Sequence, residues 1–452
     1  MRRMLVVLAV VLSTGAVGFA NTLDAARTGP SLVRKAVSEN SSESAAAIAA
    51  LRARGQSGVE DFLDAFSVEL RNRELETADT TPRPANPEWQ RISNALDQVC
   101  QQRDCNASRL FWYTDFNEAK AAAKLSGKPI LSLRLLGRLD EELSCANSRF
   151  FRLILYSNTE VSAMLREHFI LHWQSVRPVP KVTIDFGDGR KLERTLTGNS
   201  IHYVLDSEGQ PIDALPGLYG PQAFIRVLAR AERVAVAFRA ATNDEERAAV
   251  LRQYHSARIN ELAVAWTGDV AKVNLSSPLS REPISPGAGA DSPPRAEVAA
   301  RAAISKMAVA ERPVLRRISS DPRILDPTVE DAGWARIAQL HADDARIDAS
   351  SKRLMRDKNL GAYGGAEPAA RASLERAVSG LQRSVAEDTV RNEFVMHNKI
   401  HEWFARASGP IDLVVLNERV YRELFLTPAS DPWLGLFPRD SYTGIENDGV
   451  KK

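Results

Sequence analysis

KPILSLRLL (residues 128–136), then a polar loop, and then CANSRFFRLILY (residues 145–156) form the stretch that decides the fold. The run from Ile130 to Leu136 is a short, continuous apolar run, which is typical of a buried strand. The pattern from Arg149 to Tyr156 predicts a helix and places Cys145 at its N-terminus. Unpaired N–H groups and the helix dipole stabilise a thiolate there, so the thiol pKa falls and the sulfur becomes nucleophilic.

Length and composition indicate a globular protein of two or three domains. The chain has 452 residues, of which 44% are hydrophobic, enough to bury ordinary cores. Its 59 basic and 57 acidic residues are interspersed and give a formal net charge of only +2. Because no basic face or stripe stands out, nucleic acid is excluded as an expected partner.

The first twenty residues predict export. Arg2 and Arg3 precede an apolar run from Met4 to Leu12, and small residues follow. This order is typical of a secretory signal peptide (residues 1–20) and predicts a periplasmic or extracellular protein. The alternative, an uncleaved anchor, would need about 20 apolar residues, and this run is shorter. No other stretch reaches that length, so no membrane span is expected after removal of the signal peptide.

The three cysteines divide into a close pair and a single residue. An oxidising compartment favours disulfides, and Cys100 and Cys105 can close a small loop if the backbone between them is not helical. Cys145 is then left without a partner. An odd thiol in an exported protein is either reactive or buried, and cysteine counting leaves both alternatives open.

Composition divides the chain into six parts. A Pro-rich linker ends the N-terminal extension, and a Pro/Ser/Gly-rich linker divides the helical second half. Between them, alternating strands and helices predict an α/β layered domain. The expected parts are a signal peptide (1–20), a helical or partly disordered extension (21–87), an α/β domain with a preceding helix and an inserted hairpin (88–240), a helical extension (241–275), a linker (276–294) and a helical C-terminal domain with a Pro/aromatic tail (295–452).

Individual elements of the α/β domain follow from periodicity and turn residues. The dipeptide Asp188-Gly189 is a strong tight-turn signal and predicts a hairpin over residues 181–196. Strands are further expected at 111–113, 130–136, 169–173, 201–206 and, as an edge strand, 211–215, with helices at 115–126, 160–168 and 220–238.

Four short segments of this domain resemble exported bacterial thioredoxin-like proteins. They are WYTDFNEA (112–119), SGKPIL (126–131), NTEV (158–161) and HFIL (168–171), with Cys145 between the second and third. The likeness covers about residues 110–234. It implies a thioredoxin-like α/β central domain. The helical patterns that follow predict an all-α C-terminal domain, which resembles no family of known function.

The resemblance implies a modified redox motif. In that family two cysteines separated by two residues interconvert between dithiol and disulfide. Here Cys145 takes the first position and Ser148 the second, where it cannot close a disulfide, and Ser200 stands where the family has a cis-proline. What remains is monothiol exchange at Cys145 with a protein or small-thiol client, with Ser148 donating to the thiolate and no cofactor. The alternative is a redox-inactive scaffold or binding protein of the cell envelope with Cys145 buried.

A second candidate site lies on the helical pattern at 368–407. His397 and His401 are four residues apart on its apolar stripe, a spacing that lets two imidazoles share one metal ion. Glu393 lies about 12 Å along the axis from His401 at 1.5 Å per residue, so a third ligand would have to come from His341 or Asp388. The alternative is a pair of histidines hydrogen-bonded within a helical core.

Overall fold

The computed structural model of the protein describes most of the chain after residue 30. The described residues are 31–78, 86–275, 279–285, 294–306, 312, 315, 316, 323, 326–364, 367–434 and 444–450. The predicted signal peptide lies outside them, as do parts of the predicted linker 276–294 and of the C-terminal tail. Within the described part of the chain, no helix is both long enough and apolar enough to span a bilayer.

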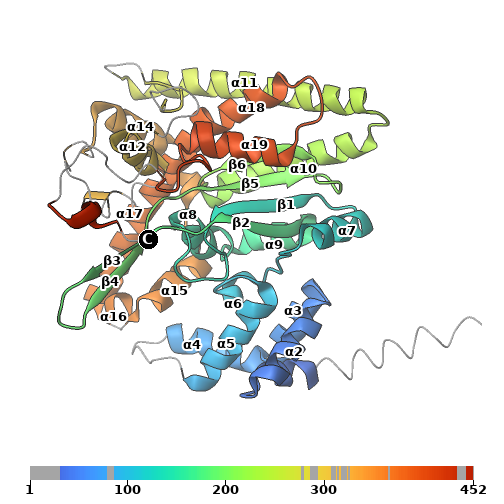
Figure 1. Cartoon of the computed structure of the whole chain (residues 1–452), viewed down its shortest axis with the longest axis vertical. Coiled ribbons are helices and arrows are strands. Elements are labelled where there is room, and N and C mark those ends of the chain that lie inside the picture. Colours follow the sequence, from blue (N-terminus) through green and yellow to red (C-terminus); the bar gives the residue numbers. More distant parts are fainter. Residues whose placement is uncertain are drawn as a thin grey trace, which may run out of the picture.

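A mixed four-stranded sheet lies at the centre of the fold (Figure 1). Its order is β2-β1-β5-β6, where the strands are β1 (Ile130–Leu136), β2 (Ile170–Arg177), β5 (Ser200–Leu205) and β6 (Pro211–Pro216). β1 runs parallel to β2 and antiparallel to β5, and β5 runs antiparallel to β6. Every residue of β1, β5 and β6 is buried, so the predicted buried strand and the α/β layering are confirmed.

One predicted strand is wrong. Residues 111–113 do not form a strand, and Tyr113 makes only a single parallel bridge to His172 of β2. The helix that follows, α7 (Phe116–Ser126), begins as expected, because the Asp115 side chain accepts hydrogen bonds from the backbone N–H groups of Asn117 and Glu118.

The two faces of the sheet are covered by different helices. His172 pairs with Ser132 and His202 pairs with Leu133, and consecutive strand residues point to opposite faces. Phe116 of α7 packs on His172, whereas the rings of Phe224, Tyr156 and Phe151 surround His202. The second face is therefore covered by α10 (Pro221–Ala240) and by the helical segment that follows Cys145, which comprises α8 (Ala146–Phe150) and the π turn η1 (Phe151–Leu155). The helix α9 (Thr159–His168) leads from there into β2.

The predicted hairpin is present but does not join the central sheet. β3 (Lys181–Asp185) and β4 (Lys191–Thr195) form a separate two-stranded sheet. Gly189 has φ 91° in the connecting turn, a conformation that favours glycine, and the Asp188 carboxylate accepts from the N–H of Arg190. Val182 and Leu196 pack against α12 (Ala296–Lys306).

The N-terminal helical region, described over residues 31–78 and 86–108, has a core of its own and continues past the predicted end of the extension at residue 87. It contains α2 (Ser41–Arg52), α3 (Gln56–Ala65), α4 (Ser67–Ala78), α5 (Pro87–Cys100) and α6 (Cys105–Ser108). Buried side chains of these helices, among them Leu51, Phe62, Leu96 and Val99, form a hydrophobic cluster separate from that of the sheet. The Arg52 side chain connects the two parts by donating to the carbonyl oxygens of Val99 and Trp112 at 2.8 and 3.3 Å.

The second half of the chain is helical, as predicted, with different boundaries. The helical pattern at 368–407 is present and contains a π turn at Asn392–His397. The elements are α11 (Asp244–Val273), α14 (Val329–Leu340), η3 (Ala342–Ala345), α15 (Ala349–Lys358), α16 (Leu360–Tyr363), α17 (Pro368–Arg391), η4 (Asn392–His397), α18 (Asn398–Ala405), α19 (Leu413–Arg419), η5 (Val420–Leu424) and η6 (Glu446–Gly449).

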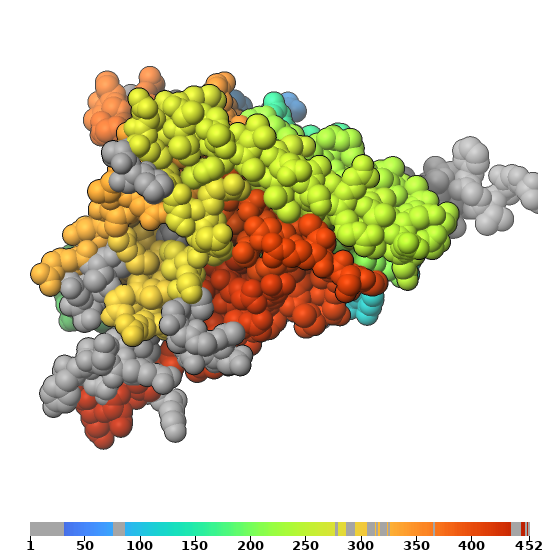
Figure 2. Space-filling model, turned by 90° about the horizontal axis from the view of Figure 1, so that it is seen from above, coloured from blue at the N-terminus to red at the C-terminus, as the bar shows by residue number. Residues whose placement is uncertain are grey.

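These helices share one hydrophobic core with the sheet. Trp334, Val385 and Phe404 belong to the same cluster of buried side chains as Leu133 and Val204 of the strands. Figure 2 shows α11 (yellow-green) lying against the orange-red helices near the C-terminus. The sheet therefore depends on the helical half of the chain to bury its apolar surface.

Candidate functional site

Cys145 lies at the N-terminus of a helix, as predicted, but it is completely buried. It is the residue that precedes α8, and its side chain has 0% exposure. The Sγ atom lies 3.9 Å from the carbonyl oxygen of Asn199. Burial disfavours the thiolate and raises the pKa of Cys145, although Ser148 and Arg149 act in the opposite direction. The sulfur is therefore a protonated thiol inside the core.

Ser148 is also buried and is engaged close to the helix start. Its hydroxyl lies 3.0 Å from the carbonyl oxygen of Cys145 and contacts the hydroxyl of Ser144. These contacts fix the first turn of α8. The two residues predicted to form the redox site are adjacent, but solvent reaches neither of them.

The C-terminal segment covers the approach to Cys145. The Tyr421 hydroxyl of η5 donates to the Asn199 carbonyl oxygen at 3.3 Å, the same oxygen that faces the thiol. The Asn199 side chain donates to the hydroxyl of Thr427 at 2.8 Å. Asn199, Tyr421 and Thr427 are all buried. The loop before β5 and residues 421–427 thus form a layer next to the thiol.

Arg177, the last residue of β2, holds this segment in place. Its guanidinium donates to the carbonyl oxygens of Thr427, Asp431 and Pro428 at 2.7, 3.0 and 3.3 Å. A guanidinium presents several donors in a fixed plane, so one side chain can bind three carbonyl groups of the segment 427–431. In the thioredoxin-like interpretation, a client would have to approach Cys145 from a side that this chain covers with its own C-terminal residues.

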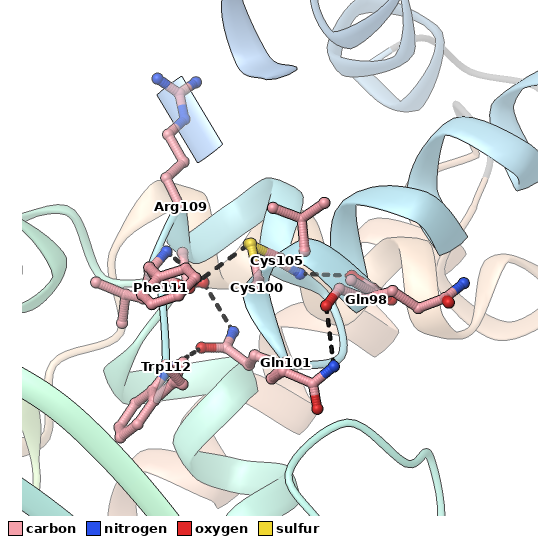
Figure 3. Close-up of a disulfide and its surroundings, with 12 residues drawn as sticks. Gln98, Cys100, Gln101, Cys105, Arg109, Phe111 and Trp112 are labelled. Carbon is pink, nitrogen blue, oxygen red and sulfur yellow. Dashed lines mark hydrogen bonds between the residues drawn. A yellow bond between two sulfur atoms is a disulfide. The ribbon is translucent and has the colours of Figure 1, made fainter. Parts of the chain in front are cut away.

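The other two cysteines form a disulfide (Figure 3). Cys100 ends α5 and Cys105 begins α6, while Gln101 and Asp104 adopt left-handed backbone conformations between them, so the connecting loop is not helical. Both cysteines have 0% exposure. The backbone N–H of Trp112 donates to the Cys100 carbonyl oxygen at 3.0 Å, and its indole N–H donates to the Gln102 side chain at 2.7 Å.

The disulfide loop also presents a carboxylate to the core of the protein. Asp104 pairs with Arg152 of η1 at 3.2 Å and with Lys358 of α15 at 2.7 Å. Arg152 is 1% exposed, and its side chain also donates to the carbonyl oxygen of Glu142. The disulfide therefore stabilises a contact between the N-terminal extension, the Cys145 helix and the helical half.

His397 and His401 belong to a buried polar cluster between β6 and the helical half. The Asp213 carboxylate of β6 accepts from His397 Nε2 at 2.9 Å and from the Tyr254 hydroxyl of α11 at 2.6 Å. His255 of α11 faces His401 through their Nδ1 atoms at 2.8 Å. Asp213 and the three histidines are all 0% exposed.

The hydrogen-bond partners determine which ring nitrogens carry protons. His255 Nε2 lies 3.1 Å from the Ile212 carbonyl oxygen, which can only accept, so that nitrogen carries a hydrogen. Burial lowers the pKa of His255 to about 4, so the ring is neutral and its Nδ1 is an acceptor. His401 must then donate from Nδ1. Burial, with a smaller contribution from His397, holds the pKa of His401 well below its usual value, so the ring is neutral. Its Nε2 is then an acceptor with no hydrogen-bond partner among the described residues.

Asp213 is the charged member of the cluster. Burial acts to raise the pKa of its carboxyl, but His397, with smaller contributions from His401 and His255, holds it well below its usual range. The backbone N–H of Ala214 adds a third donor, at 2.8 Å from Oδ1. The carboxylate is therefore bound by three donors from three segments of the chain.

The cluster offers ligands for a metal ion, which include the expected His401 but not the expected His397. Asp213, His255 and His401 each have a ligand atom within 4.8 Å of the others, and two imidazoles with one carboxylate are a known zinc ligand set. The hydrogen bond from His255 to Ile212 is of the kind that orients metal-bound histidines. The expected third ligands lie elsewhere: His341 pairs with Asp269 at 2.6 Å, and Asp388 is not a member of the group.

Sequence reasoning missed Asp213, His255 and Tyr254. One signal was present for His255, because it lies four residues after Leu251 and seven before Leu262, on the stripe of α11 that is buried. Asp213 gave no signal, since a lone aspartate in a short apolar strand has no characteristic spacing.

Comparison of the chain with protein-family models, with curated proteins and with solved structures finds no match.

Proposed function

We propose that this protein is a redox-inactive, thioredoxin-like scaffold of the cell envelope that binds another protein through its helical half. The observation that carries the proposal is the complete burial of Cys145. Thiol exchange requires a thiolate that can attack a client disulfide. Burial of Cys145 keeps a client away from the sulfur and disfavours its ionisation.

The strand order supports the thioredoxin-like part of the proposal. From one edge to the other, the order is the Tyr113 bridge, β2, β1, β5 and β6, with β1 parallel to β2 and antiparallel to β5. Cys145 follows the central strand β1 and precedes a helix. The order of elements along the chain agrees with the one on which the resemblance rests, with the hairpin β3–β4 inserted before β5.

The remaining sulfur and hydroxyl groups support the loss of redox chemistry. Ser148 cannot resolve a mixed disulfide, and Cys100 and Cys105 are joined to each other without exposure to solvent. None of the three cysteines described is therefore placed to attack a client disulfide or to resolve a mixed disulfide. A scaffold role agrees with the way in which the C-terminal segment packs over Cys145 and removes the space that a client would need.

Alkylation of the native protein across pH tests the proposal. Iodoacetamide is added to native and urea-unfolded protein between pH 6 and 10, and labelling of Cys145 is followed by mass spectrometry. We expect the native thiol to react at least a hundredfold more slowly than the unfolded one at every pH. Rapid native labelling that titrates below the free-cysteine value of about 8.5 would instead establish an activated thiolate and overturn the scaffold proposal.

A further inference from the structure

Arg134 is a buried cation without a countercharge in the part of the chain that the structure describes. It lies on the central strand β1, and its side chain is 8% exposed. Among the described residues, no carboxylate oxygen lies within 4.0 Å of its guanidinium, and its Nε atom is buried without a hydrogen-bond partner. Burial of an unpaired charge is costly, so such an arginine in the middle of a sheet requires an explanation.

The groups around Arg134 do not neutralise it. Its guanidinium lies 5.7 Å from the ring centre of Phe116, a cation–π contact. Tyr203 and Tyr421 are nearby, but their hydroxyls donate elsewhere, to the side chain of Asn417 and to the carbonyl oxygen of Asn199. Burial lowers the pKa of Arg134, yet the free arginine value is high enough for the side chain to stay charged.

Arg134 lines a cavity of about 690 Å³ that opens to solvent. The cavity lies on the α7 face of the sheet, between the end of β2, the turn at residues 208–210 and the segment 410–417 that begins α19. Its apolar lining includes Phe116, Val176 and Val414, of which the last two are 37% and 76% exposed. This size lies in the range of small-molecule sites, which combine apolar walls with a few polar groups.

The charges of the rim restrict the ligand. Glu208 and Asp412 also line the cavity, and both already have partners: Glu208 pairs with Lys124 at 2.9 Å, and Asp412 accepts from the N–H groups that begin α19. One cation at the floor and two carboxylates at the rim favour an anion with a single charge over a dianion such as a phosphate monoester.

We propose that this cavity binds an organic monocarboxylate with an apolar chain. Arg134 holds the carboxylate, for which its planar guanidinium is suited, and the chain lies against Phe116, Val176 and Val414. The proposal goes beyond the scaffold function and does not depend on the state of Cys145.

Calorimetric titration with octanoate tests the site, with octanamide as the uncharged counterpart. We expect octanoate to bind with one site per chain and octanamide at least tenfold more weakly. Arg134→Met keeps the apolar stem and removes the charge, and we expect it to weaken octanoate binding about ten- to a hundredfold, the loss of a charge-assisted hydrogen-bond pair. Arg138→Met is the matched control, because Arg138 pairs with Asp140 outside the cavity, and it should bind octanoate as the unmodified protein does.

Two further measurements distinguish a missing site from a misfolded variant. Without ligand, Arg134→Met should melt at the same temperature as the unmodified protein or higher, because an unpaired buried charge is removed. Val414→Asp places a carboxylate at an exposed position of the rim and should weaken octanoate binding at least tenfold without changing the melting temperature. Tighter binding of N-acetyl-Leu-Val than of octanoate would identify the carboxylate as the end of a peptide chain. No octanoate or peptide binding at millimolar concentration, or unchanged affinity in Arg134→Met, would overturn the proposal.

Discussion

Arg177 and Thr427, 250 positions apart in the sequence, are joined by a hydrogen bond of 2.7 Å from the guanidinium to the backbone carbonyl oxygen. The same side chain reaches two more carbonyl oxygens of the C-terminal segment. The residues that cover Cys145 are thus fixed to the end of β2 by one side chain. Local opening of this segment should be the easiest route by which solvent reaches the thiol.

Arg177→Ala should increase access to Cys145 without unfolding the protein. Loss of hydrogen bonds from a charged donor removes about 1.5–3 kcal/mol from the free energy of local opening, which corresponds to native alkylation about ten- to a hundredfold faster. The rate is measured with iodoacetamide, and near-ultraviolet circular dichroism reports whether the fold persists. Arg138→Ala, which replaces an exposed arginine in the loop after β1, is the control. Equal labelling rates in the two variants would show that a contact other than those of Arg177 holds residues 421–427 over Cys145.

The Cys100–Cys105 disulfide should stabilise the fold modestly. A loop of this length contributes about 2 kcal/mol through the entropy of the unfolded chain. We expect the double variant Cys100→Ala/Cys105→Ala to lose at least this amount in urea unfolding, since both side chains are also buried. Cys145→Ala, which leaves the disulfide intact, is the comparison. A double variant as stable as Cys145→Ala would mean that the contacts of Asp104 alone hold the loop.

Asp97, beside the disulfide, should make stability dependent on pH. Burial raises the pKa of the Asp97 carboxyl to about 7, with a smaller contribution from the nearby Asp104. Because this value is above that of the unfolded chain, the folded state favours the protonated acid, and stability is lost as the pH rises from about 4 through 7. Each pKa unit between the folded and unfolded chains corresponds to about 1.4 kcal/mol. With a difference of about three units, the free energy of unfolding can fall by about 4 kcal/mol between pH 4 and pH 8.

Asp97→Asn should therefore stabilise the protein more at pH 8 than at pH 5. The amide oxygen of asparagine can still accept from the Cys105 N–H, which donates to the Asp97 carboxylate at 2.9 Å. Melting temperatures are compared across pH 4.5–8.5, with Asp64→Asn on the exposed side of α3 as control. A parallel pH dependence in the unmodified protein and Asp97→Asn would show that Asp97 is ionised in the fold without penalty.

Asp213 should be essential to the junction between the sheet and the helical half. Its removal leaves His397, Tyr254 and a backbone N–H of β6 without their shared acceptor. Asp213→Ala is expected to lower the free energy of unfolding by about 3–5 kcal/mol, the range for breaking one partner of a buried pair. Glu245→Ala in the exposed first turn of α11 should change it by less than about 0.5 kcal/mol. Urea unfolding at pH 7 compares the two variants, and a small effect of Asp213→Ala would mean that water replaces the carboxylate.

Zinc binding to the histidine cluster should be negligible. The Asp213 carboxylate already has three donors, and His255 Nδ1 accepts from His401, so an ion would have to displace several hydrogen bonds. We expect less than about 0.1 zinc per chain by elemental analysis in both the unmodified protein and His401→Ala. Stoichiometric zinc that is absent from His401→Ala would instead establish Asp213, His255 and His401 as ligands.

All the predicted strands except residues 111–113 are present, because their signals in the sequence are local. Ile130–Leu136 is a continuous apolar run, and it forms the strand with the same bounds. The turn at Asp188-Gly189 depends on a backbone conformation that glycine allows, so two residues were enough to place the hairpin. The π turns inside the helical segments gave no such signal, since their composition is that of ordinary helix.

The state of the candidate site could not be predicted, because long-range contacts decide it. Cys145 stands at a helix N-terminus, where the local rule favours a thiolate, but Tyr421 and Thr427 approach from the other end of the chain and remove the solvent. His397 and His401 showed the correct spacing for a shared ligand, yet their partners Asp213 and His255 come from two other segments. Spacing within one helix carries no information about what packs against it.

The burial of β6, at the edge of the central sheet, has a consequence for how the chain folds. An open strand edge can pair with an extended segment of another molecule, which is a common start of aggregation. Here the Ile212 carbonyl of that edge accepts from His255, and α18 lies alongside. Both α11 and α18 are synthesised after β6, so this edge is fully covered only when residues up to 405 have been added. A chain that ends before α18 should therefore associate through β6 and precipitate.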